Sequence, residues 1–259
     1  MKYREIKIKR ALNQIIGLDE IYRPTYPLNF VEDISDNDEI YELDIAGSVE
    51  KELRYLFSIY MKVLYEYEAY RNDNIKLYNA LISNELEHFI LRFPVILDIL
   101  NKHFLSLINN AIKDIEEVIP FDTDIIRIKK IRNEIVHHGA GCLVRSDIKA
   151  VSFKIFLNRT TIIKHLPNEV WISQEVDGYN CISSYLTWML CLLLNYLDDF
   201  FKEANRLRTK GMKISNKHIS EVDNSDEINS YVYSRLILRS DELNLYKNNL
   251  EKLLIDNII

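Results

Sequence analysis

The sequence predicts a mainly α fold: an up-down helical bundle with a small β-hairpin or sheet appendage and extra helices at the C-terminal end. Long stretches repeat apolar residues at spacings of three and four, the period of an amphipathic helix. Gly 6 and Pro 5 are few for 259 residues, which argues against an all-β fold rich in turns. Hydrophobic residues make up 47% of the chain, enough for a sizeable core.

The chain is predicted to begin with an arm, residues 1–35, which contains a short helical pattern at 6–16. Acidic residues then start the clearest helical pattern, where they stabilise the positive end of the helix dipole. Its apolar stripe continues from 45 to 70, and a stripe of this length is typical of a helical bundle. The bundle is predicted to span residues 36–208.

Two further long helices are predicted within the bundle. The first covers 74–112, and Pro94 predicts a kink or a break at 92–94. The second covers 178–208, and its apolar middle indicates either the central helix of the bundle or one shared with a second subunit. The apolar run at 185–197 is shorter than the about 20 residues of a membrane span, so no membrane partner is expected.

A β insertion is predicted at about 150–176, because three short segments there alternate in polarity or are rich in β-branched residues. The segments are 150–156, 161–165 and 170–176, and a hairpin loop at 158–160 is expected between the first two. Residues 209–259 are predicted to form a C-terminal helical appendage, with amphipathic pieces at 226–239 and 241–256.

Charge is distributed unevenly along the chain. The net charge is −6, but residues 125–165 hold nine Lys or Arg side chains and two carboxylates. That segment has a charge of +7, which leaves −13 for the rest. RNA, a polyanion, is expected to be attracted to the basic segment, and the alternative is a basic surface that is merely solvated.

The cysteines and the N-terminal residues predict a reduced, cytoplasmic protein. The three cysteines are scattered, so neither a disulfide framework nor a zinc site is expected. The first residues, MKYREIKIKRALNQ, lack the apolar run of a signal peptide. Glu85, Glu87 and His88 lie close together in one predicted helix, but without a matching cluster elsewhere they are expected to form a solvated face. No metal or cofactor is predicted.

The basic segment contains the sequence IIRIKKIRNEIVHHG at Ile125–Gly139. A cap at Asp122 or Thr123 and a stop at Gly139 predict one helix here, since glycine accepts the left-handed conformation that ends helices. A flexible turn at 138–141 is expected to leave both histidines accessible. The predicted buried stripe consists of Ile125, Ile128, Ile131, Ile135 and Val136.

Asn133 and His137 are four residues apart, so they share a face of this helix, and the long Arg132 side chain reaches across to join them. The face is polar and cationic, which suits a phosphate. The further cations predicted to bind RNA are Arg127, Lys129, Lys130 and Arg145.

These side chains suit RNA cleavage without a metal. An imidazole has an unperturbed pKa of about 6.5, so it can exchange protons with ribose oxygens near neutral pH. A guanidinium stays charged and donates two parallel hydrogen bonds to phosphate oxygens. The reaction needs two proton transfers, which are easier with two imidazoles, so a homodimer that brings two motifs together is expected.

The stretch from Arg132 to His137, R-N-E-I-V-H, resembles the motif of the HEPN family (higher eukaryotes and prokaryotes nucleotide-binding). That motif is an Arg, four to six residues and a His, very often with a polar residue directly after the Arg. His138 also satisfies the spacing. The resemblance implies a HEPN-like helical bundle and a homodimer with a composite, metal-independent ribonuclease site. It further implies a bacterial defence toxin or effector, with an antitoxin or another defence partner.

Carried over residue by residue, the resemblance implies that Arg132 stabilises the phosphate and His137 is the general acid/base. Asn133 is the supporting polar residue, and His138 is an alternative to His137. Some family toxins have a Tyr two places after the His, where this chain has Gly139, so control by modification of such a tyrosine is not expected.

Other interpretations stay open at this stage. The two histidines would also be favourable, when charged, as simple partners of the negative end of the helix dipole. The chain could be a non-catalytic module of the same fold that binds RNA or nucleotides or holds a protein partner. A third interpretation is a helical protein-interaction domain that uses exposed tyrosines.

Overall fold

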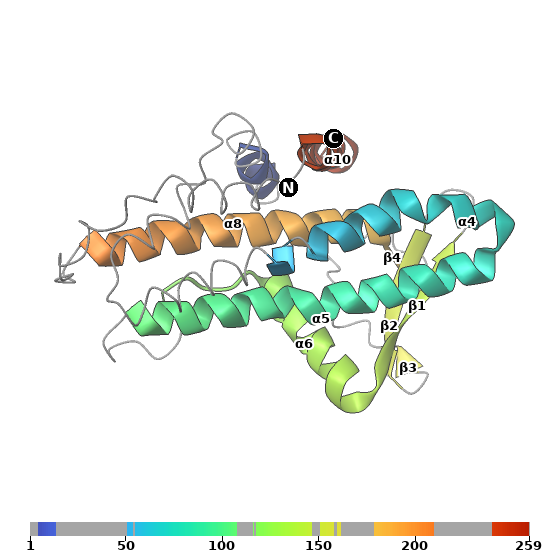
Figure 1. Cartoon of the computed structure of the whole chain (residues 1–259), viewed down its shortest axis with the longest axis horizontal. Coiled ribbons are helices and arrows are strands. Elements are labelled where there is room, and N and C mark those ends of the chain that lie inside the picture. The colour runs from blue at the N-terminus through green and yellow to red at the C-terminus, as the bar shows by residue number, and fades with distance from the viewer. Residues whose placement is uncertain are drawn as a thin grey trace, which may run out of the picture. The chain divides into compact units, whose positions relative to one another are not determined.

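A computed structural model describes most of the helical part of the chain. The described residues are 5–13, 51–53, 55–107, 116, 118–146, 151–157, 160–161, 179–209 and 240–258. They are mostly helical, with one small antiparallel sheet, which confirms the predicted fold class at this level (Figure 1). The loop of the arm, the predicted start of the first long helix, the strand at 170–176 and the helix at 226–239 lie outside the described residues.

The chain divides into two compact units. One unit consists of Met1–Leu53, Ile96–Pro120 and Leu193–Ile259, and the other of Arg54–Val95 and Phe121–Leu192. The second unit contains every residue of the predicted site, so the fold of that unit decides what surrounds it. Among the described helices, none combines the length and the apolar character that a membrane-spanning segment needs.

The helix at 55–61 is followed by a π-helical turn, η1 (Lys62–Glu66), and by α4 (Glu68–Asp73). The N–H of Tyr67 donates to the carbonyl of Lys62, a bond that spans five residues instead of four. A π-turn adds a residue to the helical turn and so rotates the residues that follow. The apolar stripe predicted to continue to residue 70 therefore stops at buried Val63, and Tyr70 is 44% exposed.

Helix α5 (Ile75–Leu107) is continuous through Pro94, so the break that the proline allowed does not occur. Asn74 caps its first turn, since the Asn74 side-chain oxygen accepts a hydrogen bond from the N–H of Leu77. Phe93, the residue before the proline, and Ile96, two residues after it, are fully buried. The free energy gained by burying these apolar side chains of α5 is larger than the cost of the one backbone hydrogen bond that the proline removes.

The sheet has β2 (Val151–Leu157) as its central strand. Strand β1 (Ala140–Ser146) pairs with one edge of β2 along the whole length of both strands. Strands β3 (Thr160–Thr161) and β4 (Asn180–Cys181) pair with the other edge of β2. The register places Leu157 opposite Thr160, as expected for the predicted hairpin. The turn predicted at 138–141 is wrong beyond Gly139, because Ala140 already opens β1.

One face of the sheet packs into the core. Cys142 and Val144 on β1 and Phe153 and Ile155 on β2 are buried, as the two-residue period of a strand requires. The ring of Phe153 lies 5.0 Å from that of Tyr185 in an edge-to-face arrangement. Burial raises the pKa of the Cys142 thiol, so this cysteine is an unreactive core residue.

Side chains of α5 cover the free edge of β1. The Cys142 N–H donates to Glu87 over 2.8 Å, and Ser83 donates to the Cys142 carbonyl over 2.7 Å. Ser146 donates to Asn79 over 2.6 Å. Because these three α5 residues are four apart, they form one row along the strand and satisfy the groups that a strand edge otherwise exposes.

Helix α8 (Ile182–Thr209) is the predicted apolar helix, and it begins four residues later than expected because β4 precedes it. Every residue from Tyr185 to Leu193 is buried. Burial within a single chain therefore accounts for its apolar character, which supports the central-helix alternative over the shared helix.

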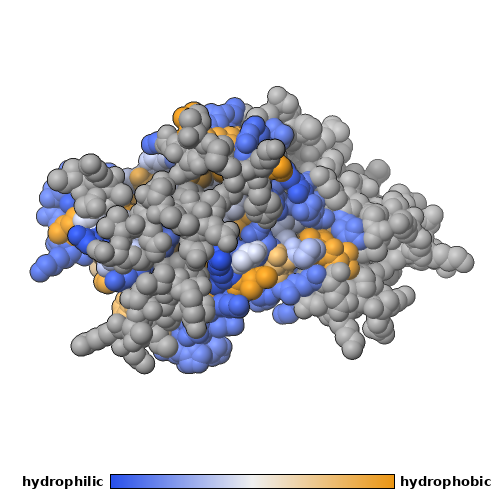
Figure 2. All heavy atoms as spheres, turned by 180° about the vertical axis from the view of Figure 1, so that it is seen from behind, coloured by the Kyte–Doolittle hydropathy of each residue, from blue (hydrophilic) through white to orange (hydrophobic). Residues whose placement is uncertain are grey.

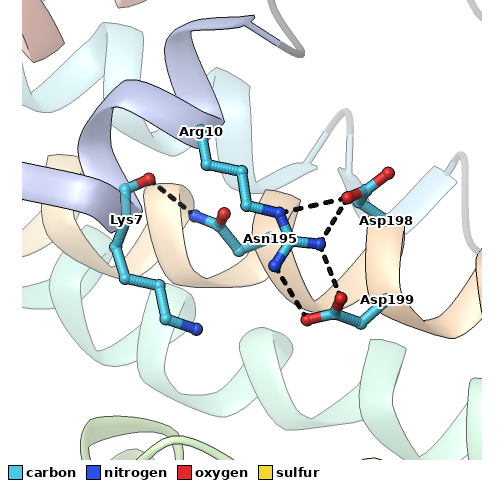
Figure 3. Close-up of polar contacts among 5 residues, drawn as sticks. All are labelled: Lys7, Arg10, Asn195, Asp198 and Asp199. Atoms are coloured by element: carbon cyan, nitrogen blue, oxygen red, sulfur yellow. Dashed lines mark hydrogen bonds and ion pairs between the residues drawn. The ribbon is translucent and has the colours of Figure 1, made fainter. Parts of the chain in front are cut away.

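In the first unit, the helix at 5–13 is joined to α8 by a polar clamp (Figure 3). The Arg10 guanidinium pairs with both Asp198 and Asp199, and its bond from Nη2 to Asp199 is 2.6 Å long. Asn195 donates to the Lys7 carbonyl over 3.0 Å. The last helix, α10 (Ser240–Ile258), matches the predicted piece at 241–256 and buries Tyr246, Leu250 and Leu253.

Candidate active site

The predicted motif lies on α6 (Thr123–His138), whose two ends are where the sequence places them. Asp122 caps the first turn, since its side chain accepts a 3.1 Å hydrogen bond from the N–H of Asp124. Gly139 ends the helix with φ 66° and ψ 31°, and its N–H donates to the Glu134 carbonyl. Both predicted helix boundaries are confirmed.

Buried Asp124 anchors the first turn of α6. Its carboxylate accepts a 2.8 Å hydrogen bond from the Trp188 indole and a 2.6 Å hydrogen bond from Arg127. Burial raises the pKa of Asp124, and these two donors oppose that shift by stabilising the charged form. Arg127 is therefore placed as the partner of a buried carboxylate, and its side chain is 21% exposed.

The buried side of α6 consists of Ile125, Ile128 and Ile131, all less than 2% exposed. Ile135 is only half-buried, and Val136 is 50% exposed, so the predicted buried stripe is wrong for Val136. The reason is the position along the helix: Val136 lies about 20° from Ile125 around the axis, but it is in the last turn of α6, beyond Ile131, where the fully buried residues end.

An exposed row of side chains runs along the opposite side of α6. It consists of Ile126, Lys130, Asn133 and His137, at spacings of three and four, with exposed Val136 beside it. Asn133 and His137 therefore share a solvent-facing surface, as predicted. In Figure 2 the coloured atoms at the lowest point of the molecule, where Figure 1 places the end of α6, are hydrophilic.

The structure brings Arg132 and Asn133 into contact. Nη1 of Arg132 donates to the side-chain oxygen of Asn133 over 3.2 Å. Arg132 is half-buried, whereas Asn133 is exposed. This bond turns the guanidinium toward the exposed row, although Arg132 itself lies at the border of that row.

The two histidines have different surroundings. Nδ1 of His138 lies 3.0 Å from a carboxylate oxygen of Glu134, so the Nδ1–H tautomer or the imidazolium can donate to that carboxylate. Within the described part of the chain, no side chain is hydrogen-bonded to His137, whose ring lies 6.5 Å from that of His138. His138 thus has a local partner, and His137 presents an open ring.

The other predicted RNA-binding cations are dispersed. The ammonium of Lys129 lies 4.4 Å above the ring of Phe121, and Lys130 is exposed in the row. Arg145 is exposed on β1, five residues beyond Ala140, which is roughly 17 Å along an extended strand. Only Lys130 therefore lies in the row with Asn133 and His137.

Two features near the motif were not predicted. The Glu134–His138 pair has the spacing of four that places residues side by side on a helix, so this signal was available in the sequence. The α5 row that covers β1 had no local signal, because it depends on tertiary packing. Among the described residues, no group of three His, Cys, Asp or Glu side chains could hold a metal ion.

The second unit thus presents a basic, exposed helix end beside a small sheet. No family model matches the chain, and no curated protein or solved structure matches it. The resemblance to the HEPN motif rests on the stretch Arg132–His137 and on its position at the end of an amphipathic helix.

Proposed function

We propose that this protein is a metal-independent endoribonuclease of the HEPN type, with a composite site formed by Arg132 and His137 from two copies of the chain. The observation that carries this proposal is the accessible motif surface on α6. There His137 is exposed, and Arg132 is tied to Asn133 by a 3.2 Å hydrogen bond.

In this mechanism the ribose 2′-oxygen attacks the adjacent phosphorus, and the bond from phosphorus to the 5′-oxygen breaks. One imidazole accepts the proton of the 2′-hydroxyl, and a second imidazole donates a proton to the leaving 5′-oxygen. The products are a 2′,3′-cyclic phosphate and a free 5′-hydroxyl. Arg132 stabilises the charge that accumulates on the non-bridging oxygens, and Asn133 orients the guanidinium.

A symmetric dimer supplies the second imidazole. Two large apolar side chains are exposed here: Ile126 in the row, at 39% exposure, and Val136 beside the row, at 50%. A two-fold contact between two such rows buries these side chains and brings the two His137 rings toward a common phosphate. The row therefore offers both contact area and reactive groups.

The assignment distinguishes the two histidines. His137 is the acid/base, because its ring is open to a substrate, while the ring of His138 is already engaged by Glu134. In the setting that the resemblance suggests, the protein is a cytoplasmic toxin or effector of bacterial defence. A protein partner or antitoxin would then act by covering the exposed row.

The test is cleavage of a labelled RNA in EDTA by the wild-type chain, beside Arg132→Ala and His137→Ala. General acid–base catalysis contributes about 10²–10⁴-fold, so His137→Ala is expected to lose at least a hundredfold in rate. The product should end in a 2′,3′-cyclic phosphate. Equal cleavage by the wild type and both variants would assign the activity to a contaminant and overturn the proposal.

The second candidate is a non-catalytic module of the same fold that binds RNA or nucleotides or holds a protein partner. The exposure of Tyr65 and Tyr70, at 42% and 44%, favours the protein-interaction form, since exposed aromatic residues are enriched in interfaces. This candidate predicts binding without any cyclic-phosphate product.

A further inference from the structure

The outward face of the sheet is a second basic surface of the same unit. The register pairs Leu143 with Lys154 and Arg145 with Ser152, so these four side chains lie on the face opposite buried Cys142 and Phe153. Leu143 is 43% exposed and Arg145 is exposed. This face therefore projects away from the core.

The described strand residues of this face carry only positive charge, and the carboxylate of Glu87 on α5 lies at the Gly141 end, 3.4 Å from where a Cβ of Gly141 would be. Across 140–146, 151–157, 160–161 and 179–181, the described strand residues include Arg145 and Lys154 but no Asp or Glu. The whole chain, by contrast, has a net charge of −6. A basic surface on an acidic protein favours a polyanion over most protein surfaces.

Two aromatic residues, Tyr179 and Phe156, lie next to Lys154. The ammonium of Lys154 lies 4.5 Å from the centre of the Tyr179 ring, a cation–π contact that holds the lysine in place. Phe156 is half-buried and pairs with Gly141, where a Cβ would lie 3.7 Å from its ring. Aromatic rings beside cations are the features that bind the bases and phosphates of single-stranded RNA.

Parts of the strand edges are already paired, which disfavours recognition by addition of a strand. The outer edge of β1 is bonded to the α5 residues Ser83 and Glu87, and the other side of β2 is shared by β3 and β4. An extended peptide that adds a strand to a sheet needs a free edge. At Cys142 and at the paired positions of β2 these edges are already occupied, whereas the outward face is exposed at Leu143 and Arg145.

The face is directly connected to the motif. Only Gly139 separates His138, the last residue of α6, from Ala140, the first residue of β1. The outward side chains then follow β1 in steps of two residues, roughly 7 Å each, from the pair Gly141–Phe156 to Arg145. A strand of RNA that follows these steps arrives at the end of α6.

We propose that this outward face, through Lys154, Arg145 and Phe156, binds single-stranded RNA and directs it to the motif of α6. The delivery of RNA to the motif rests on the proposed ribonuclease function. RNA binding by the face does not, and it can be measured without cleavage.

The test measures binding of a labelled single-stranded RNA by fluorescence anisotropy, with His137→Ala present in every chain so that the probe stays intact. The test variant is Arg145→Ala with Lys154→Ala. The matched control is Lys76→Ala with Lys252→Ala, two exposed lysines on other elements that give the same change in net charge. Circular dichroism checks that both variants keep the wild-type helix content.

The test variant is expected to raise Kd at least tenfold, and the control less than twofold. Loss of two phosphate contacts should also reduce the slope of log K against log salt by about 1.4, at about 0.7 per contact. Similar Kd values for the test variant and the control, or no RNA binding by the parent chain, would overturn the proposal.

The two proposals can fail separately. If the parent chain binds RNA through the face but the wild type does not cleave it, the ribonuclease assignment fails and the RNA-binding face stands. If the wild type cleaves RNA and the test variant binds as well as the control, the face is excluded and the ribonuclease assignment stands.

Discussion

Replacement of Trp188 by Phe tests whether α6 is anchored through buried Asp124. The indole N–H donates a 2.8 Å hydrogen bond to that carboxylate, and Phe removes the donor while keeping an aromatic ring. A hydrogen bond to a charged group is worth about 1.5–3 kcal/mol, and the smaller ring costs about 1 kcal/mol more in lost packing. We expect the free energy of unfolding to fall by about 2.5–4 kcal/mol at neutral pH.

The effect should depend on pH in a defined direction. Burial raises the pKa of Asp124 in the folded state, so its proton is bound more tightly in the folded than in the unfolded chain. The stability that this proton gives is present below the unfolded pKa and is lost as pH rises through the folded pKa. Loss of the Trp188 donor raises the folded pKa further, so Trp188→Phe should cost most at neutral pH and least in acid.

Urea denaturation followed by circular dichroism, at neutral pH and at the lowest pH where the wild type stays folded, measures both effects. The matched control is Asp124→Asn, which keeps an oxygen to accept the indole bond but cannot ionise. In the Asp124→Asn background the cost of Trp188→Phe should lose its pH dependence. A cost below 0.5 kcal/mol, or one with the same pH dependence in both backgrounds, would refute the anchoring role.

Three further predictions concern positions where the structure assigns a local role. Gly139→Ala should lower the free energy of unfolding by about 1 kcal/mol, because φ 66° strains a residue with a Cβ although no atom lies within 4 Å of it. Gly139→Asn should cost less in the same thermal melt, and equal melting temperatures for all three chains would contradict this. Arg10→Ala should destabilise by about 1–3 kcal/mol in urea, since it removes the guanidinium from two carboxylates. Arg10→Lys should recover only part of that, because an ammonium cannot donate in the same forked geometry. Glu134→Gln, which weakens the exposed pair with His138, should change stability by less than 0.5 kcal/mol. It should also leave RNA cleavage within about threefold of the wild type if His137 is the acid/base.

The ends of α6 could be predicted from the sequence because capping is local. Asp122 and Gly139 act through hydrogen bonds and backbone angles within one turn, so the residues at those positions decide where the helix starts and stops. The exposed positions of Asn133 and His137 follow from the same helical period. These parts of the candidate site needed no knowledge of the rest of the fold.

Strand β1 was missed although its sequence contains the signal. Ala140, Cys142 and Val144 alternate with outward residues, but Gly139 and Gly141 favoured a turn instead. Gly141 is tolerated because Phe156 from the neighbouring strand covers it. That cover comes from a pairing between strands, which a local pattern does not contain.

The π-turn at Lys62–Glu66 had no local signal either. Tyr67, the residue that follows it, donates a 2.8 Å hydrogen bond to Glu85 on α5, and burial together with Glu85 raises the pKa of Tyr67 to about 12. The phenol therefore stays a donor at neutral pH. This contact between two helices of the unit accompanies the π-turn. The spacing of apolar residues in the sequence does not predict such a contact.

The single residue between α6 and β1 makes the length of this junction critical. Strand side chains alternate between faces, so one inserted residue before Ala140 would exchange the two faces if the backbone pairing were kept. Arg145 would then point into the apolar interior and Val144 into water. Substitutions at the junction change only its local strain, whereas an insertion or deletion of one residue disrupts the whole strand.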